Sequence, residues 1–330
     1  MQTVPFPASN NWFFVMRDIL SDILQTLRLR GSFYFRLGFS APFGVEVPTY
    51  KQSARFHLVV QGNCIVRLAN GQTLPLANGD LILIPRGQSH RILDSANSNY
   101  APLEQVLENA GYRGEGVVVA APAAHATTNE LVCGHFTFRN GASHPILQFL
   151  PDAIIVTAAM RARFGWLDDV VRMMARRVFE AHATPLNQGM IAIVQRLAEV
   201  MFVEILRAGL SQSPEMQRVI GAFSDERIGK TLTLIHAHPE KPWTVESLAK
   251  EIGMSRARFA DQFTERVGEG PASYLRGWRL QCAAALLDDT RLNMQQIAAK
   301  VGYESTAAFS RAFSQRFGIA PSDYRSEIAE

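Results

Sequence analysis

Two stretches near the end of the chain, WTVESLAKEIGMSRARFADQFTERVGEGPASY (243–274) and NMQQIAAKVGYESTAAFSRAFSQRFGIAPSDY (293–324), repeat one pattern. Ala249 and Gly253 recur 49 residues later as Ala298 and Gly302. From Ser255 onward the offset is 50, so the turn after the shared glycine gains one residue. The further pairs are Phe259/Phe309, Phe263/Phe313, Arg266/Arg316, Gly268/Gly318, Pro271/Pro321 and Tyr274/Tyr324. Such a repeat decides the fold of its segment and is interpreted first.

Each copy has the pattern of a short helix, a tight turn and a second helix. In the first copy Thr244 can cap the first helix, Gly253 supplies the turn and Ser255 caps the second helix. The corresponding residues of the second copy are Asn293, Gly302 and Ser305. Residues 271–287 predict one long helix between the copies, which would set their spacing. Helix-turn-helix geometry places a recognition helix in the major groove of DNA. A plain helical bundle is the alternative, but the repeated caps and glycines favour DNA binding.

The last hundred residues contain further motifs that carry a resemblance. They are Trp243–Ala249, Gly253–Ser255, Tyr274, Arg279-Leu280, Ile297-Ala298, Val301–Tyr303, Phe309–Phe313, Phe317-Gly318 and Pro321–Arg325. In these residues the segment closely resembles the AraC/XylS family of bacterial transcription regulators. The resemblance implies that both recognition helices enter adjacent major grooves on one face of promoter DNA. It also implies RNA polymerase as a partner, an activator role and homodimers.

The same resemblance indicates which residues face the bases. On the first recognition helix they are Ala257, Ala260 and Asp261, with Arg256 and Arg258 nearby, and on the second they are Thr306, Ala307, Ser310 and Arg311 beside the cap Ser305. Arginine reads guanine, and threonine or alanine meets the thymine methyl group. The first helix departs from the family in offering few donors. Residues 229–330 hold 13 Lys and Arg against 12 Asp and Glu, which predicts modest nonspecific affinity. The alternative for each of these residues is that it lies on the solvated surface and does not contact a base.

The first half of the chain has a different character. Short β-rich runs at 33–37, 56–68, 80–84, 116–120 and 130–139 are separated by Gly, Pro and Asn. This pattern predicts an all-β sandwich or barrel. Asn70-Gly71 predicts a hairpin. Residues 17–29 have the spacing of a short amphipathic helix.

The segment GDLILIPRGQSH (79–90) follows the pattern G-x5-P-x-G-x2-H, which matches the second cupin motif. It predicts a strand, a Pro-Gly turn and a return strand that directs His90 into a small barrel. The first cupin motif is degraded, because Arg55 stands where enzymatic cupins hold a metal-binding glutamate and only His57 lies near. Residues 56–150 resemble the cupin-type sensor domain of a subgroup of AraC-type regulators. That resemblance implies detection of a signal in or near the barrel.

Four residues of this region could form a small site, namely His57, His90, Cys133 and His135. Cys133 and His135 are two apart on a predicted strand and share a face. Histidine and cysteine together suit zinc or another borderline metal. Cys133, alone or together with Cys64, could instead be an oxidant-sensing thiol. The remaining alternative is that these are separate, hydrogen-bonded or simply buried side chains, as Cys282 is expected to be.

Composition limits the class of protein. The 330 residues are 47% hydrophobic and 19% charged with a net charge of +3, so charge alone does not indicate nucleic acid. Three scattered cysteines, with neither a signal peptide nor a membrane span in the sequence, predict a cytoplasmic protein. Apolar faces at 166–181 and 186–210 predict long helices, part of which could pair two chains.

These observations predict a multi-domain α+β protein. We expect a cupin-like β-barrel in residues 1–150, a helical connector in 151–225 and an all-α double helix-turn-helix domain in 226–330. The expected function is sequence-specific transcription regulation, controlled by a small molecule, metal or oxidant sensed in the barrel, without enzymatic activity. A metal-dependent cupin enzyme fused to a DNA-binding domain is the alternative. A ligand-independent architectural DNA binder is a third.

Overall fold

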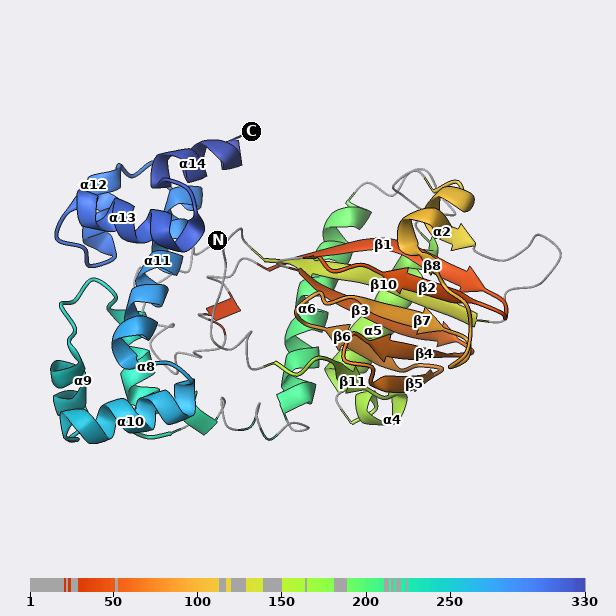
Figure 1. Cartoon of the computed structure of the whole chain (residues 1–330), viewed down its shortest axis with the longest axis horizontal. Coiled ribbons are helices and arrows are strands. Elements are labelled where there is room, and N and C mark those ends of the chain that lie inside the picture. Colours follow the sequence, from red (N-terminus) through yellow and green to blue (C-terminus); the bar gives the residue numbers. More distant parts are fainter. Residues whose placement is uncertain are drawn as a thin grey trace, which may run out of the picture. The chain divides into compact units, whose positions relative to one another are not determined.

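The computed structural model of the chain has two compact parts (Figure 1). Leu29–Ile220 form one, here called the β unit, and Gly221–Glu330 with Met1–Arg28 form the other, the helical unit. The structure describes residues 29–50, 53–112, 117–119, 129–138, 150–163, 165–180, 189–210, 221–223 and 225–329, with 21, 23, 24, 214 and 217. Most of the helix expected at 17–29 lies outside these residues. The domain boundaries after 150 and 225 stay predictions.

The β unit contains two sheets. The order of the larger, six-stranded sheet is β11-β6-β3-β10-β1-β9, and that of the five-stranded sheet is β5-β4-β7-β2-β8. The strands of the first are β1 Arg30–Phe39, β3 Ser53–Gln61, β6 Leu81–Ile84, β9 Val117–Val119, β10 Asn129–Thr137 and β11 Ile154–Val156. Those of the second are β2 Gly44–Val47, β4 Asn63–Leu68, β5 Thr73–Ala77, β7 His90–Leu93 and β8 Ala101–Pro102. The predicted cupin-like β fold is confirmed.

Strand β3 is buried on both faces, since every residue from Ser53 to Val59 is buried. Inward-facing Val59 joins the core between the two sheets, while outward-facing Phe56 lies 5.2 Å from Phe136 between ring centroids. Phe136 in turn packs 4.8 Å from Phe202. The run predicted at 56–68 as one β segment is two strands, because Gly62 turns the chain with φ of 79°.

Two long helices, α5 Gly165–Glu180 and α6 Met190–Leu210, belong to the β unit. Helix α6 packs on β1, β10 and β11 and covers the outer face of the larger sheet (Figure 1). The approach is close, since a Cβ on Gly209 would lie 2.8 Å from the Ile154 side chain. The two short helices of the unit in the described part are α2 Leu103–Asn109 and α4 Ala158–Arg161.

The predicted strand-turn-strand around Pro85 is present as β6, a turn and β7. Gly87 has φ of 58°, and a Cβ there would lie 2.3 Å from the Tyr50 carbonyl oxygen. Glycine is therefore required both by the left-handed backbone and by the close approach of another chain segment. The turn places His90 at the start of β7, where only 2% of its surface is exposed.

The helical unit holds both copies of the repeat. Its helices are α8 Ile228–Ala237, α9 Val245–Glu251, α10 Arg256–Val267, α11 Pro271–Asp289, α12 Met294–Lys300, α13 Thr306–Phe317 and α14 Pro321–Ala329. The four predicted N-caps are confirmed, because Thr244, Ser255, Asn293 and Ser305 each accept a hydrogen bond from the backbone three residues on. Helices α9-α10 and α12-α13 are thus two helix-turn-helix copies joined by α11.

Each copy has the same aromatic core. In the first copy the Phe263 ring meets Phe259 and Tyr274, both at 5.6 Å between centroids. In the second copy Phe313 meets Phe309 and Tyr324 in the same edge-to-face manner, at 5.6 and 5.3 Å. The phenylalanines are fully buried, so each copy fixes its recognition helix with the same apolar anchors.

Candidate DNA-binding surface and sensor site

The first candidate recognition helix, α10, exposes one face opposite its phenylalanines. Ala257 and Asp261 are exposed and Ala260 is half-buried, and their spacing of three and four residues puts them side by side. Arg256 and Arg258 are exposed at the start of the helix. The structure thus brings the five expected residues of this copy onto the free surface of one helix.

The second candidate recognition helix, α13, presents Ala307, Ser310 and Arg311 at the same spacing. Arg311 and Ala307 are exposed, and Ser310 and Thr306 are half-buried. Ser305 is the N-cap of this helix, since its Oγ accepts from the Ala308 amide at 3.2 Å. Its hydroxyl therefore has a structural partner, which leaves four side chains as the candidate reading set of this helix.

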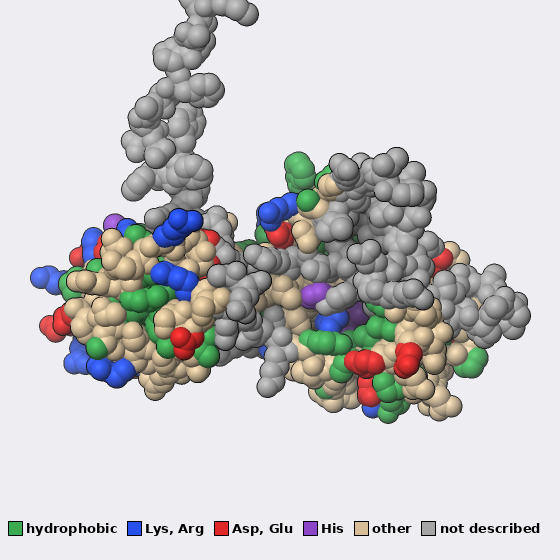
Figure 2. Space-filling view, turned by 90° about the horizontal axis from the view of Figure 1, so that it is seen from above, with side chains coloured by type: hydrophobic (Ala, Val, Ile, Leu, Met, Phe, Trp, Pro, Cys, Tyr) green, Lys and Arg blue, Asp and Glu red, His purple; other side chains and the backbone are tan. Residues whose placement is uncertain are grey.

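On the face of the helical unit seen in Figure 2, the charged side chains are not gathered into one stripe. Figure 2 shows its Lys and Arg side chains, on the left of the view, in separate patches with neutral and acidic side chains between them. Arg266 is paired with Asp225, and Arg279 donates to the Pro239 and Lys241 carbonyl oxygens. These two arginines hold parts of the helical unit together, whereas Arg256, Arg258 and Arg311 are exposed on α10 and α13.

In the β unit three of the four expected site residues lie together. His57 on β3 has its Nδ1 3.1 Å from the Cys133 Sγ on β10 and its Nε2 2.8 Å from the Nε2 of His90. The His57–Cys133 contact follows from sheet register, because these residues are direct partners across β3 and β10. His135 is half-buried further along β10, opposite Arg55.

The three side chains form a hydrogen-bonded chain with a fixed direction. His90 Nδ1 lies 2.9 Å from the Gln88 carbonyl oxygen, which can only accept, so this nitrogen carries the proton. In neutral His90 the Nε2 then accepts from the His57 Nε2–H, and the His57 Nδ1 accepts from the Cys133 thiol. The sequence pattern singled out the three side chains, but not the Gln88 backbone oxygen that orients them, because a carbonyl leaves no mark in a sequence.

The electrostatics of the site keep this chain neutral. Burial lowers the pKa of His57 well below its usual value, and His90 and Arg55 lower it further. Burial likewise lowers the pKa of His90 to about 4. Burial raises the pKa of the Cys133 thiol above its usual range and that of Cys64 to about 12. Protonated thiols and neutral imidazoles are thus the favoured forms.

The residues present do not fit a zinc ion. Among the described residues, no group of three or more His, Cys, Asp or Glu side chains is placed to hold a metal. His57 directs its two nitrogens to different partners on opposite edges of the ring, so Cys133 and His90 do not converge with it on one point. Arg55 is buried, and its guanidinium carbon lies 3.7 Å from the Tyr50 ring centroid. Arg55 occupies the position at which enzymatic cupins hold a metal-binding glutamate. Its positive charge would repel a metal cation at this site.

The space beside the chain is small. A cavity of about 20 Å³ is lined by Arg55, His57 and Cys133 among apolar residues. One water molecule needs about 10–15 Å³ of such volume, so the cavity accommodates a single water and no organic molecule.

Comparisons with known proteins cover both units. A cupin family model matches residues 18–211, and a helix-turn-helix domain model matches residues 248–327. The HTH-type transcriptional regulator AlkR of Acinetobacter baylyi is 30% identical, over 94% of this chain and 99% of its own length. The RCS-specific HTH-type transcriptional activator RclR of Escherichia coli is 24% identical, over 84% of this chain and 85% of its own.

Solved structures were compared in the same way. The DNA-binding domain of AdpA, a global transcriptional factor in complex with a target DNA, is 25% identical with a TM-score of 0.31. That match covers 31% of this chain and 93% of the AdpA domain. None of the helices in the described part of the chain is both long and apolar enough to cross a membrane.

Proposed function

Because this chain belongs to the AraC-type transcriptional regulators that carry an N-terminal cupin domain, we propose that it binds promoter DNA through α10 and α13 together and that the β unit controls this binding. One observation carries the proposal: two copies with the same caps, turns and aromatic core each hold a recognition helix with a free face. Promoter DNA lies in the bacterial cytoplasm, which we propose as the location.

The two recognition helices would contribute different chemistry. Arg311 offers a guanidinium for guanine, and Ser310 offers a hydroxyl beside it. On the first helix Ala257 and Ala260 suit thymine methyl groups, and Asp261 suits the cytosine amino group. Arg256 and Arg258 are proposed to contact phosphates beside the first helix. Thr306 and Ala307 are proposed to contact bases at the second helix.

A genome-wide binding experiment tests this function. Purified full-length protein would be incubated with fragmented genomic DNA, and the retained fragments sequenced. A discrete set of promoter sites is expected, and Arg311→Ala should lower their enrichment. Uniform coverage, unchanged by that substitution or by added cell extract, would contradict sequence-specific binding.

We propose that the signal is sensed at Cys133, as oxidation of its thiol. The metal interpretation does not fit the side chains, and the cavity of about 20 Å³ is too small for an organic molecule. The relative RclR is by name an RCS-specific activator, and for this chain we propose an oxidant as the class of signal. In the reaction a peroxide takes two electrons from the thiol, sulfur gains a hydroxyl and water leaves. Because burial keeps the thiol protonated, the reaction requires the β unit to open locally.

The expected readout is promoter binding measured with and without hydrogen peroxide. Cys133→Ala should abolish the response, because the thiol that the peroxide oxidises is then absent. Cys282→Ala is the matched control, since Cys282 lies on α11 in the other unit. A response that persists in Cys133→Ala would refute this sensor. The variant Cys64→Ala tests whether the Cys64 thiol reacts with the oxidised Cys133 to form a disulfide. No response of wild-type protein to any oxidant or extract would favour the architectural DNA binder.

We propose that the cupin unit is not an enzyme. The alternative of a metal-dependent dioxygenase needs two or three histidines and a carboxylate around an open metal position. Arg55 stands at the carboxylate position and is buried, which opposes a cation there. Metal analysis of the purified protein and oxygen uptake in its presence would reveal a catalytic centre if one existed.

A homodimer is proposed through the exposed face of α5 and α6. Trp166 is 80% exposed, and Met173, Ile193 and Val200 are each 46% exposed, which is unusual for large apolar side chains. Val200→Glu should shift full-length protein toward the monomer in sedimentation velocity. A monomeric wild-type protein would remove this proposal. RNA polymerase is the partner expected for an activator bound at a promoter.

A further inference from the structure

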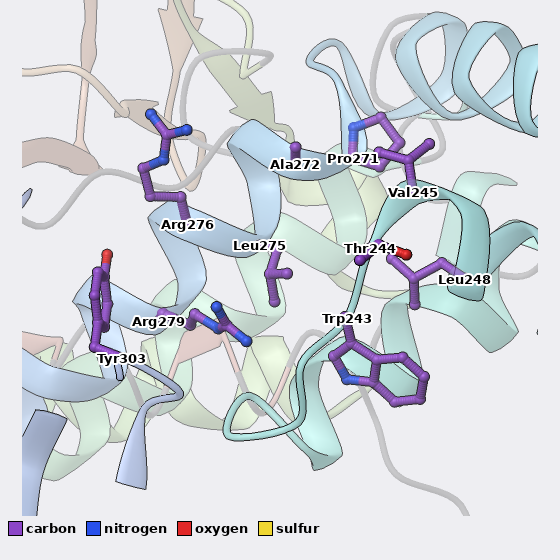
Figure 3. Close-up of a pocket in the computed structure, with 10 residues that line it drawn as sticks. All are labelled: Trp243, Thr244, Val245, Leu248, Pro271, Ala272, Leu275, Arg276, Arg279 and Tyr303. Atoms are coloured by element: carbon purple, nitrogen blue, oxygen red, sulfur yellow. The ribbon is translucent and has the colours of Figure 1, made fainter. Parts of the chain in front are cut away.

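The helical unit contains a cavity where its two copies meet. It measures about 230 Å³ and is lined by ten residues, all labelled in Figure 3. Leu248 comes from the first copy, Arg276 and Arg279 from α11, and Tyr303 from the turn of the second copy. Drug-sized ligands occupy about 300–1,000 Å³, so this cavity suits a smaller molecule.

The cavity has an apolar end and a polar end. Figure 3 shows Val245, Leu248 and Trp243 on one side, with Arg276, Arg279 and Tyr303 on the other. Leu248 and Leu275 are buried, so the apolar end is already shaped by packing. The Trp243 indole is held in place by its hydrogen bond to the His238 carbonyl oxygen at 2.8 Å.

The polar end carries two positive charges, and the acidic neighbour of Arg279, Glu240, lies outside the lining. None of the ten lining residues is acidic. Arg276 makes no hydrogen bond or ion pair with the described residues, and Arg279 donates only to two carbonyl oxygens, at 2.7 and 2.6 Å. Two guanidinium groups beside an apolar surface favour an anion that they can bind through charge-assisted hydrogen bonds.

Tyr303 adds a donor that is unused within the described residues. Its hydroxyl oxygen is buried without a hydrogen-bond partner there. Burial raises the pKa of Tyr303, so the hydroxyl stays protonated and can donate. A buried hydroxyl without a partner destabilises the folded state, and an incoming acceptor would remove that cost.

We propose that this cavity binds a small amphipathic carboxylate. The carboxylate accepts hydrogen bonds from Tyr303 and the arginines, and its hydrocarbon part lies against Leu248 and Trp243. Such a ligand would touch both copies and α11 at once. It would thereby act on the helical unit directly, independently of the signal sensed in the β unit.

Isothermal titration of the full-length protein with sodium 3-phenylpropionate tests this site, with 3-phenylpropan-1-ol as the neutral analogue of equal size. Saturable binding of the carboxylate is expected, with about tenfold weaker binding of the alcohol. Tyr303→Phe removes only the hydroxyl, and Arg276→Gln removes an exposed charge, so each should fold and weaken carboxylate binding about tenfold. Arg291→Gln is the matched control, because it makes the same charge change at an exposed position away from the cavity.

Equal binding of acid and alcohol, or equal losses in Arg276→Gln and Arg291→Gln, would overturn the proposal. So would the absence of any carboxylate binding. If carboxylate binding is absent while Arg276→Gln and Tyr303→Phe weaken binding to nonspecific duplex DNA, the cluster is a phosphate contact and the cavity is not a ligand site. The DNA measurement uses the same purified variants at matched ionic strength.

Discussion

The two helix-turn-helix copies share their turns and helix ends and differ in the side chains on their exposed faces. Both first helices end in a Schellman turn, in which Met254 and Tyr303 donate to the carbonyl oxygens of Ala249 and Ala298, each at 2.9 Å. Both second helices end at a left-handed glycine, with φ of 85° at Gly268 and 81° at Gly318. The repeated residues are therefore those that packing and backbone geometry require.

The differences lie on the exposed faces. Positions 257, 260 and 261 hold Ala, Ala and Asp, whereas the equivalent positions 307, 310 and 311 hold Ala, Ser and Arg. A carboxylate thus stands where the other copy has a guanidinium. The comparison teaches that one scaffold has been kept while its two exposed faces came to differ, with an aspartate at position 261 and an arginine at the equivalent position 311, so the copies are expected to contribute unequally to DNA recognition.

The largest expected effect separates the two turn glycines. Gly253 and Gly302 both have positive φ, but a Cβ on Gly302 would lie 2.6 Å from the Pro239 carbonyl oxygen, and one on Gly253 meets nothing within 4 Å. Gly302→Ala should lower the free energy of unfolding by about 2–4 kcal/mol and Gly253→Ala by about 1–2 kcal/mol. Urea unfolding of the full-length variants measures both. Equal losses of unfolding free energy in the two variants would show that backbone strain alone determines the cost. The atoms around Gly302 would then move enough to accommodate the added Cβ.

The next effect concerns DNA affinity. Arg311→Ala should weaken binding to the natural operator by about 1–3 kcal/mol if the guanidinium reads a base. Fluorescence anisotropy on the operator and on a scrambled duplex distinguishes base reading from a phosphate contact, which would weaken both equally. Arg316→Ala is a control on the same helix, exposed and one turn further along. Unchanged operator affinity in Arg311→Ala would remove this residue from the recognition surface.

The N-cap serines offer a smaller, matched test. Ser255→Ala and Ser305→Ala should each cost about 1 kcal/mol of stability, because each removes the acceptor for one backbone amide at the start of a recognition helix. The Ser305 hydrogen bond is the shorter, at 3.2 Å against 3.4 Å, so its loss should cost slightly more. Thermal unfolding gives the stabilities. If Ser305→Thr keeps stability but loses operator affinity, Ser305 contacts DNA in addition to capping.

The smallest effect should come from Asp261→Asn. Removing this exposed carboxylate should strengthen nonspecific DNA binding by less than about 1 kcal/mol, because a single surface charge interacts weakly with phosphates through solvent. Operator preference should fall at the same time if Asp261 accepts from a cytosine amino group. A competition experiment with operator and nonspecific duplex measures the ratio. Stronger binding to both with an unchanged ratio would make Asp261 a passive surface residue.

Local features of the fold could be predicted from the sequence. The caps at Thr244 and Asn293, the turn glycines and the hairpin before His90 all depend on a few neighbouring residues, and the structure confirms them. The family resemblance then gave the architecture of both units. The positions that contact DNA stay predictions, since exposure alone does not distinguish a reading residue from a solvated one.

Features that depend on distant parts of the chain escaped prediction. The run 56–68 is divided by a turn at Gly62, and strand β3 is buried on both faces although polar and apolar residues alternate from Ser53 to Leu58. For His57, His90, Cys133 and His135 the sequence left open a metal site, an oxidant-sensing thiol and hydrogen-bonded or buried side chains, and sheet register sets three of them in a line that ends on the Gln88 carbonyl oxygen. The joint cavity depends on Tyr303 meeting α11 and α9, which no local pattern encodes.

Helix α11 has a consequence for the length of the operator. Its 19 residues give a rod of about 28 Å, slightly shorter than the ~34 Å of one turn of B-DNA. The helix is continuous from Pro271 to Asp289, so it would fix the distance between the two recognition helices. The operator should then contain two unlike sequence blocks about ten base pairs apart, centre to centre. Lengthening the DNA between the two blocks by half a helical turn would place one block on the opposite side of the duplex. The two recognition helices could then no longer bind both blocks at once.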